Sequence, residues 1–376
     1  MIYFDNAATT LQKPQTVSRA VLSAMQTMTT PGRGNHKSAQ LAADTAFQCR
    51  EIASEMFGVP AIENVVFTMN ATHALNIAIR SLVPQGGHVV ISGYEHNAVT
   101  RTLRDLGAKV EIASAPLFQT DLQLQAFEAK IVQGVDAVIC THVSNVFGFV
   151  LPIEEIAFCC QKLHIPLIVD ASQSAGILPL DMQKLGAHFI AMPGHKGLYG
   201  PQGTGLLLCM SEAKPLISGG TGSDSLRQEM PPFLPDRLEA GTHNMPGIAG
   251  LKAGMRFIEK TTSERILRHE QKMLEEAASV LYALPNIHLF YSAHGNQVGV
   301  LSFRHETYSA ELLAELLAQE GIAVRAGLHC APLAHRTAHT ESDGTVRISF
   351  SAFNTKAEVR YFDEAMKRVL RRAKKY

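Results

Sequence analysis

The sequence lacks an excess of charge of either sign, because 34 Lys and Arg residues balance 34 Asp and Glu residues. This balance creates no general attraction to nucleic acid or to an anionic membrane. No segment approaches the roughly 18 apolar residues that a membrane-spanning helix needs, and no basic segment precedes an apolar run at the start of the chain. We therefore expect a soluble, cytoplasmic protein that binds neither nucleic acid nor a membrane.

The chain also lacks the patterns of a metal site or a disulfide framework. Its six cysteines include no C-x-x-C pair, and its 16 histidines form neither H-E-x-x-H nor H-x-H. A chain of this length does not need disulfides for stability. We expect reduced thiols and no metal ion.

What the sequence does contain is a large apolar fraction. Hydrophobic residues make up 46% of the 376 residues and charged residues 18%, which excludes a disordered chain. At roughly 100–200 residues per domain, the length predicts two domains. We place a large domain at 14–250, and a smaller C-terminal domain at 251–376, to which residues 1–13 are added.

Short β-branched runs alternate with helical patterns across the large domain. This alternation is typical of helical crossovers, and therefore of a mainly parallel sheet of seven strands that is covered by helices. In such a sheet, ligands bind at the carboxyl ends of the strands. The expected strands are 65–68, 89–92, 110–112, 137–140, 167–170, 189–192 and 206–209, and the expected helices are 14–28, 38–57, 71–83, 97–107, 121–133 and 153–163.

The C-terminal part shows a different order of elements, which is typical of an α+β domain. A long, lightly interrupted helical pattern over 246–282 predicts a helical connector between the two domains. After it we expect strands at 287–290, 298–303, 322–325 and 345–350, helices at 309–320 and 356–373, and a polar loop at 326–344.

Asp170 and Lys196 are the most informative pair of polar residues. Asp170 ends one strand and Lys196 lies just past the next strand, so both side chains can reach one crevice. A lysine there can form a Schiff base with an aldehyde cofactor, while a carboxylate keeps a pyridine nitrogen protonated. This division of work indicates a pyridoxal phosphate enzyme. The alternative is structural, with Asp170 capping a helix and Lys196 in solvent.

Further motifs in the same order along nearly the whole chain resemble the class V aminotransferase superfamily, and within it the group II cysteine desulfurases and selenocysteine lyases. The resemblance implies pyridoxal phosphate fold type I, with a large and a small domain. The matching segments are Tyr3-Phe4-Asp5-Asn6-Ala7-Ala8-Thr9-Thr10, Asn35-His36, Glu95-His96-Asn97-Ala98, His142-Val143-Ser144-Asn145, Asp170 with Lys196, Glu239-Ala240-Gly241-Thr242, Arg325-Ala326-Gly327-Leu328-His329-Cys330-Ala331 and Arg347-Ile348-Ser349.

The resemblance implies a role for each residue around the cofactor ring. Lys196 would form the Schiff base and move the Cα proton of the substrate. Asp170 would pair with the pyridine nitrogen, Gln173 would bind the phenolate oxygen, and His96 would stack on the ring as a catalytic residue. Asn145 would assist at the phenolate oxygen or at the substrate carboxylate.

The cofactor phosphate needs several donors, which a helix N-terminus supplies. The resemblance assigns Ala71, Thr72 and His195 to this phosphate, and Thr242 from the second subunit of a homodimer. Where relatives carry Ser or Thr three residues before the lysine, this chain has Pro193, so one hydroxyl contact is missing.

Cys330 decides the expected reaction. It lies in a loop, beside His329 and five residues after Arg325, where positive neighbours favour the thiolate. The resemblance implies that Cys330 takes the substrate sulfur as a persulfide and that alanine is released. Relatives often have His-His-Cys, whereas this chain has Leu328 at the first of these positions.

The substrate would be held mainly through its carboxylate. Arg347 matches the arginine that binds this group in the family, and a planar guanidinium suits a carboxylate. The resemblance adds His36 and Arg325 to the substrate site.

These features predict a cysteine desulfurase that delivers persulfide sulfur for iron–sulfur cluster or cofactor assembly, with a sulfur-acceptor protein as a partner. Three alternatives remain at this point. The chain is a selenocysteine lyase acting on L-selenocysteine, a class V aminotransferase without desulfurase activity, or a non-catalytic protein derived from such an enzyme.

Overall fold

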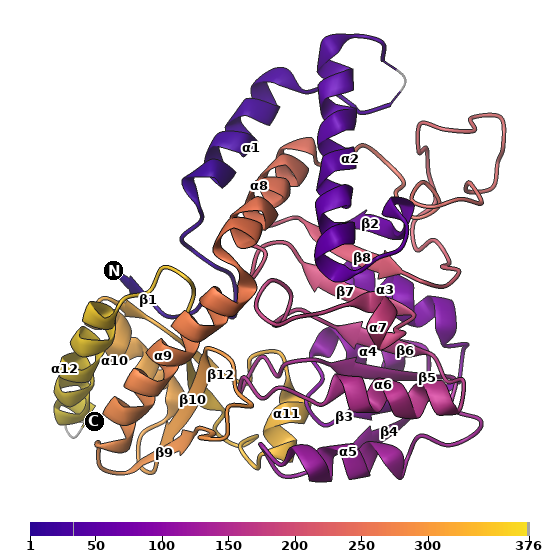
Figure 1. Cartoon of the computed structure of the whole chain (residues 1–376). Coiled ribbons are helices and arrows are strands. Elements are labelled where there is room, and N and C mark those ends of the chain that lie inside the picture. Colours follow the sequence, from indigo (N-terminus) through magenta and orange to yellow (C-terminus); the bar gives the residue numbers. More distant parts are fainter. Residues whose placement is uncertain (33, 374–376) are drawn as a thin grey trace.

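A seven-stranded mixed sheet forms the centre of the computed structural model, which describes residues 1–32 and 34–373 (Figure 1). Its strand order is β2-β8-β7-β6-β5-β3-β4. The strands are β2 (Val65–Thr68), β3 (His88–Ser92), β4 (Lys109–Ala113), β5 (Ala137–Thr141), β6 (Leu167–Asp170), β7 (Phe189–Pro193) and β8 (Gly205–Cys209).

Four of the strand pairs in this sheet are parallel, and β8 runs antiparallel to both β2 and β7. All seven predicted strands are present, each within one residue of its predicted ends. The predicted α/β class and the mainly parallel seven-stranded sheet are therefore confirmed. The register of β6 and β7 pairs Asp170 with Ala191, which brings the ends of these two strands together.

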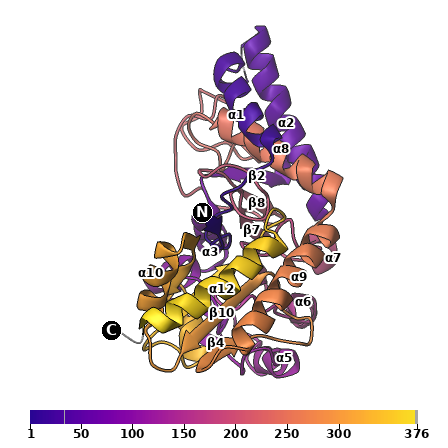
Figure 2. The ribbon, with the colours of Figure 1, turned by 90° about the vertical axis from the view of Figure 1, so that its left-hand side faces the viewer.

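Helices cover both faces of the sheet, because alternate side chains of each strand point to opposite faces. In β5, Val138 packs in one core with α2, α5 and α6, whereas Ile139 packs in another with α3 and α4. These helices are α1 (Gln15–Thr27), α2 (Lys37–Phe57), α3 (Ala71–Leu82), α4 (Asn97–Asp105), α5 (Thr120–Glu128), α6 (Ile153–Lys162) and α7 (Met182–Leu185), with a 3₁₀ turn at Ile62–Asn64. Figures 1 and 2 show α1 and α2 beside α8 (Met245–Thr261).

The C-terminal part forms a second core around a four-stranded sheet of order β12-β13-β10-β9. A separate parallel pair joins β1 (Ile2–Tyr3) to β11 (Ile322–Ala323), so the start of the chain belongs to this part. Its other elements are α9 (Ser263–Tyr282), β9 (Ile287–Phe290), β10 (Val300–His305), α10 (Ala310–Gln319), β12 (Arg325–Gly327), α11 (Pro332–Thr337), β13 (Thr345–Ser349) and α12 (Lys356–Ala373). The predicted domain boundary at 250 falls inside α8, and the division into two domains stays a prediction.

The light interruption expected in the helical pattern over 246–282 lies at Thr262, which takes a left-handed φ of 69° and whose side chain caps α9, so the segment forms two helices. Two predictions for this part were wrong. The strand expected over 322–325 is divided between β11 and β12, which lie in different sheets. The loop expected over 326–344 contains the end of β12 and the whole of α11.

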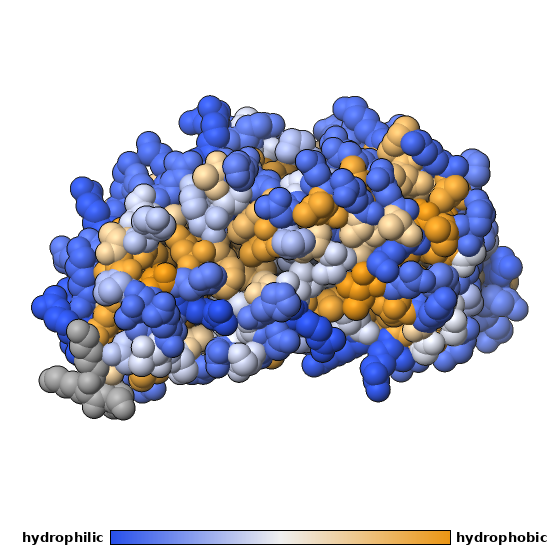
Figure 3. Space-filling view, turned by 90° about the horizontal axis from the view of Figure 1, so that it is seen from below, coloured by the Kyte–Doolittle hydropathy of each residue, from blue (hydrophilic) through white to orange (hydrophobic). Residues whose placement is uncertain are grey.

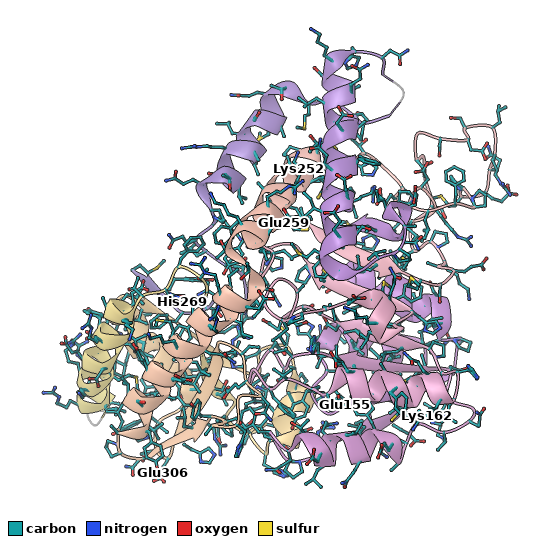
Figure 4. The ribbon with its side chains drawn as sticks, viewed as in Figure 1. Glu155, Lys162, Lys252, Glu259, His269 and Glu306 are labelled. Carbon is teal, nitrogen blue, oxygen red and sulfur yellow. The ribbon has the colours of Figure 1, made fainter. Side chains whose placement is uncertain are left out.

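The surface carries mostly hydrophilic side chains, with apolar ones in separate patches on the face shown in Figure 3. Figure 4 marks charged residues on the outer helices, such as Glu155 and Lys162 on α6 and Glu259 on α8. Among the described residues, no helix is both long and apolar enough to span a membrane.

Candidate active site

Lys196 follows the end of β7 in a tightly packed turn. A Cβ on Gly197 would meet the backbone oxygen of Ala175 at 2.4 Å, so glycine permits the close approach that holds this turn. Burial lowers the pKa of the Lys196 ammonium to about 8, although Asp170 opposes this effect. An amine with this pKa is partly unprotonated near neutral pH, as a nucleophile or base requires.

Asp170 ends β6 and is almost fully buried. Its Oδ1 accepts a hydrogen bond from the backbone N–H of Ser172 at 2.9 Å. Gln173 lies nearby and donates from Nε2 to the backbone oxygen of Ala7 at 2.9 Å. Asp170 thus accepts a bond from the turn that follows, but no helix begins within the described residues 171–181 for it to cap, and Lys196 is only partly exposed.

The N-terminus of α3 lines one end of the cavity that contains Lys196. The side chain of Asn70 caps the helix by accepting from the N–H of His73 at 2.9 Å. The N–H groups of Ala71 and Thr72 precede the first intrahelical hydrogen bonds and are free to bind an anion. His195 faces the same cavity, and its buried Nδ1 has no hydrogen-bond partner in the described part of the chain.

His96 caps α4, and this contact fixes its tautomer. Its Nδ1 accepts from the N–H of Ala98 at 3.0 Å, so in the neutral ring the proton lies on Nε2. Burial lowers the pKa of His96, and this keeps the ring neutral. A neutral, fixed imidazole is suited to stacking on an aromatic ring.

Cys330 is exposed and lies in a tight turn after β12. Both His329 and Cys330 take left-handed φ angles, of 49° and 58°. The turn is held by three hydrogen bonds: Asn97 N–H to the Cys330 oxygen at 2.8 Å, Asn145 Nδ2 to the His329 oxygen at 2.8 Å, and Ala331 N–H to the Leu328 oxygen at 2.9 Å. These bonds tie the cysteine to the helix that follows His96.

The expectation that His329 is a positive neighbour of Cys330 was wrong. His329 is buried, and burial lowers its pKa to about 2, so the ring is neutral at physiological pH. Arg325 remains as the positive neighbour that the sequence predicted, because its exposed side chain lines the same cavity as Cys330.

Arg347 lies in β13 directly opposite Arg325 of β12. Its Nη2 donates to Asp5 Oδ1 at 2.8 Å and its Nη1 to the backbone oxygen of Asn145 at 2.8 Å. Its Nε is buried without a partner among the described residues. The guanidinium is thus oriented by Asp5, a contact that the sequence analysis missed because 342 residues separate the two.

One cavity of about 210 Å³ brings most of the predicted site residues together. Among the residues that line it are Ala71, Thr72, His96, Asn145, Asp170, Gln173, His195, Lys196, Arg325, Cys330 and Arg347. Two predicted residues do not line it in their own chain. Thr242 lines a separate cavity with Glu239 and His243, and His36 caps α2 by accepting from Ala39 N–H.

Comparison with known proteins agrees with this geometry. The family model for aminotransferase class-V matches residues 2–362. The chain belongs to this family. A probable cysteine desulfurase from Pyrococcus abyssi is 31% identical, over 96% of this chain and 92% of that protein. A probable cysteine desulfurase from Mycolicibacterium paratuberculosis is 32% identical over 98% of this chain, which spans only 55% of that protein.

A solved structure resembles the whole fold. The apo structure of a cysteine desulfurase from Thermococcus onnurineus NA1 has a TM-score of 0.90 and 32% sequence identity. The match covers 98% of this chain and 94% of the other. The family membership and the similarity to cysteine desulfurases therefore agree on the cysteine desulfurase reaction.

Proposed function

We propose that this protein is a pyridoxal phosphate-dependent cysteine desulfurase, which converts L-cysteine to L-alanine and takes up the sulfur on Cys330 as a persulfide. The observation that carries the proposal is that Lys196, Asp170 and Cys330 line one cavity. The family match and the similarity to cysteine desulfurases support the same activity.

The residues of the cavity fit the cofactor. The buried Nδ1 of His195, which has no partner in the described residues, and the free N–H groups of Ala71 and Thr72 suit a phosphate. Lys196 would hold the aldehyde carbon and Asp170 the pyridine nitrogen. Further contacts would come from Gln173 at the phenolate oxygen, His96 over the ring face and Asn145 beside it. When bound, pyridoxal phosphate supplies an electron sink for the bonds at the substrate Cα.

Lys196 would move the proton of the substrate Cα. Burial lowers its pKa to about 8, so a neutral amine is accessible near physiological pH. The Arg347 guanidinium, held by Asp5, would bind the substrate carboxylate and so fix the direction of the Cα–H bond. Arg325 would add positive charge on the same side of the cavity, and His36 stays a predicted substrate contact.

Cys330 would carry out the sulfur transfer. Its thiolate forms a bond to the substrate sulfur while the carbon–sulfur bond of the substrate breaks. The carbon that loses sulfur takes up a proton and leaves as alanine. The persulfide on Cys330 therefore contains two sulfur atoms, the Sγ of Cys330 and the sulfur that came from the substrate.

We also propose that the enzyme acts as a homodimer and passes its sulfur to an acceptor protein. Thr242 lines a cavity that Ala71, Thr72 and His195 of the same chain do not line. Placement of Thr242 at the partner's phosphate would give this residue the role that the sequence predicts. The molar mass in solution, measured by light scattering, tests the dimer.

The activity is tested with purified protein, pyridoxal phosphate, L-cysteine and a reductant. The proposal expects alanine and sulfide in equal amounts, with both lost in Lys196→Ala and in Cys330→Ala. Cys159→Ala is the matched control, because Cys159 lies on α6, away from the cavity, and this variant keeps full activity.

Three results would contradict the proposal. Undiminished cysteine turnover in Cys330→Ala would exclude the persulfide route. Turnover of selenocysteine alone would indicate a selenocysteine lyase. Pyruvate formed with a keto-acid acceptor, without sulfide, would indicate an aminotransferase.

A further inference from the structure

A buried carboxyl group joins two strand ends beside the active-site cavity. Glu95 follows β3 and has no exposed surface. Its Oε1 accepts the hydroxyl proton of Ser92, the last residue of β3, at 2.6 Å. The same oxygen accepts the backbone N–H of Thr141, the last residue of β5, at 2.7 Å. Because β3 and β5 are neighbours in the sheet, this one oxygen holds their carboxyl ends together.

The Thr141 side of this link lies beside Asp170. Thr141 is paired in register with Asp170 between β5 and β6, and both residues line the active-site cavity. The backbone N–H of the next residue, His142, donates to the backbone oxygen of Asp170 at 3.0 Å. Glu95 therefore connects the end of β3 to the strand pair that carries the proposed partner of the pyridine nitrogen.

The two residues that follow Glu95 both contribute to the site. His96 caps α4 by accepting the N–H of Ala98 at 3.0 Å. The N–H of Asn97 donates to the backbone oxygen of Cys330 at 2.8 Å. One short segment thus carries both the imidazole proposed to lie over the cofactor ring and the amide that holds the Cys330 turn. The side chain of Glu95 anchors this segment to β5.

Glu95 makes this link as an uncharged acid near neutral pH. Its Oε2 is buried and has no hydrogen-bond partner among the described residues. Burial raises the pKa of Glu95 to about 8, and Asp170 of β6 acts in the same direction. Cys140 of β5, a second titratable neighbour, stays a thiol because burial raises its pKa as well. An uncharged carboxyl group still accepts through Oε1, and so does the amide of a glutamine.

We propose that Glu95 is a positioning residue for His96 and Cys330. Through Oε1 it joins the ends of β3 and β5, and so it fixes the segment that carries the His96 ring and the amide bonded to Cys330. Glu95 does not line the cavity, so it acts through its neighbours. His329 and Cys330 take left-handed backbone angles, which need support from their surroundings. The proposal rests on the sulfur-accepting role of Cys330 given above.

The test compares two side chains of similar length in place of Glu95. Glu95→Gln keeps an oxygen acceptor, whereas Glu95→Met leaves the Ser92 hydroxyl and the Thr141 N–H without one. The first readout is hydrogen exchange of the Asn97 amide in the cofactor-free protein, because this amide bonds to Cys330. The second readout is the kinetics of alanine formation by the holoenzyme.

We expect Glu95→Met to speed exchange at Asn97 and to lower kcat, each by about tenfold, with KM for cysteine unchanged. We expect Glu95→Gln to stay within about threefold of the wild type in both readouts. No effect of methionine, or no rescue by glutamine, would overturn the proposal. An equally large increase of exchange at Leu207 in β8 would also overturn it, because the whole fold would then be loosened.

Gln123→Met is the matched control. Gln123 is also fully buried, and its Nε2 donates to the backbone oxygen of Ala113 at the end of β4, at 2.8 Å. The control therefore removes a buried polar side chain from the end of the strand on the other side of β3. It should leave exchange at Asn97 and kcat unchanged. Changes equal to those of Glu95→Met would contradict a specific role of Glu95.

A further variant covers the case in which Glu95→Met does not fold. Ser92→Ala removes one of the two hydrogen bonds to Oε1, and it should speed exchange at Asn97 by a smaller amount. Unchanged exchange would contradict the proposed link. Because exchange is measured without cofactor or substrate, it stays informative even if the wild-type protein shows no desulfurase activity.

Discussion

Replacement of the partly buried Lys196 should stabilise the cofactor-free protein. Burial lowers the pKa of this lysine from the ordinary 10.5 to about 8, so the folded state binds the proton less tightly than the unfolded state. At about 1.4 kcal/mol per pKa unit, the charged side chain costs the fold roughly 3 kcal/mol below pH 8. The variant Lys196→Met keeps the length of the side chain and removes this cost.

The size of the effect can be worked out for a thermal melt. An unfolding entropy of about 2.1 cal/mol/K per residue amounts to roughly 0.8 kcal/mol/K for the whole chain, so the midpoint of Lys196→Met should rise by about 4 °C at pH 7. The gain should shrink as the pH rises from 8 to 10.5, because the wild-type lysine then folds in its neutral form. Calorimetry of both cofactor-free proteins across this range measures it.

Lys214→Met is the matched control, because Lys214 is exposed. The difference in thermal midpoint between this variant and the wild type should not shrink between pH 8 and pH 10.5. An equal or lower midpoint for Lys196→Met at pH 7 would refute the reasoning. So would a gain that grows above pH 8.

Three other substitutions test separate parts of the structure. The buried guanidinium of Arg50 donates to both carboxylate oxygens of Glu239, at 2.8 and 2.6 Å. Glu239→Gln removes this counter-charge, and the resulting loss of about 3–5 kcal/mol in the free energy of unfolding should lower the thermal midpoint by roughly 4–6 °C. Arg347→Lys keeps a cation beside Asp5 but loses the planar pair of donors, so KM for cysteine should rise by about tenfold or more in steady-state assays. Pro193→Ser introduces the hydroxyl that the family resemblance implies at this position, and absorbance titration should show tighter binding of pyridoxal phosphate by about tenfold.

The central strands of the large sheet were predictable because they are apolar on both faces and stand between helical patterns, as in a sheet that helices cover. The edge strand β4 differs, because Lys109, Val110 and Ile112 are exposed. The predicted ends of all seven strands agree with the structure to within one residue. Asp170 and Lys196 were predicted to meet because Asp170 ends one strand and Lys196 follows the neighbouring strand of that sheet.

The errors arose where local pattern is weak. The six residues of α11 are too few to show a repeating apolar pattern of helical period. The short strand β12 is defined only by its pairing with the distant β13. The interruption within 246–282 was predicted without its position, because Thr262 breaks the pattern with neither a proline nor a glycine; the polar run 261–264 was the available signal for a helix start.

The missed parts of the site are contacts between distant residues. Two of these contacts are the ion pairs of Asp5 with Arg347 and of Arg50 with Glu239. Each joins residues far apart in the chain, and no motif in the sequence links them. The neutral state of His329 depends on burial by β13 and α11, which only the folded chain shows.

The most direct test of the account is mass spectrometry of the peptides after the holoenzyme has turned over cysteine once without a reductant. The account predicts one added sulfur atom on the peptide that carries Cys330, in an amount equal to the alanine formed. Alanine without added sulfur, or sulfur on any other cysteine in place of Cys330, would contradict it.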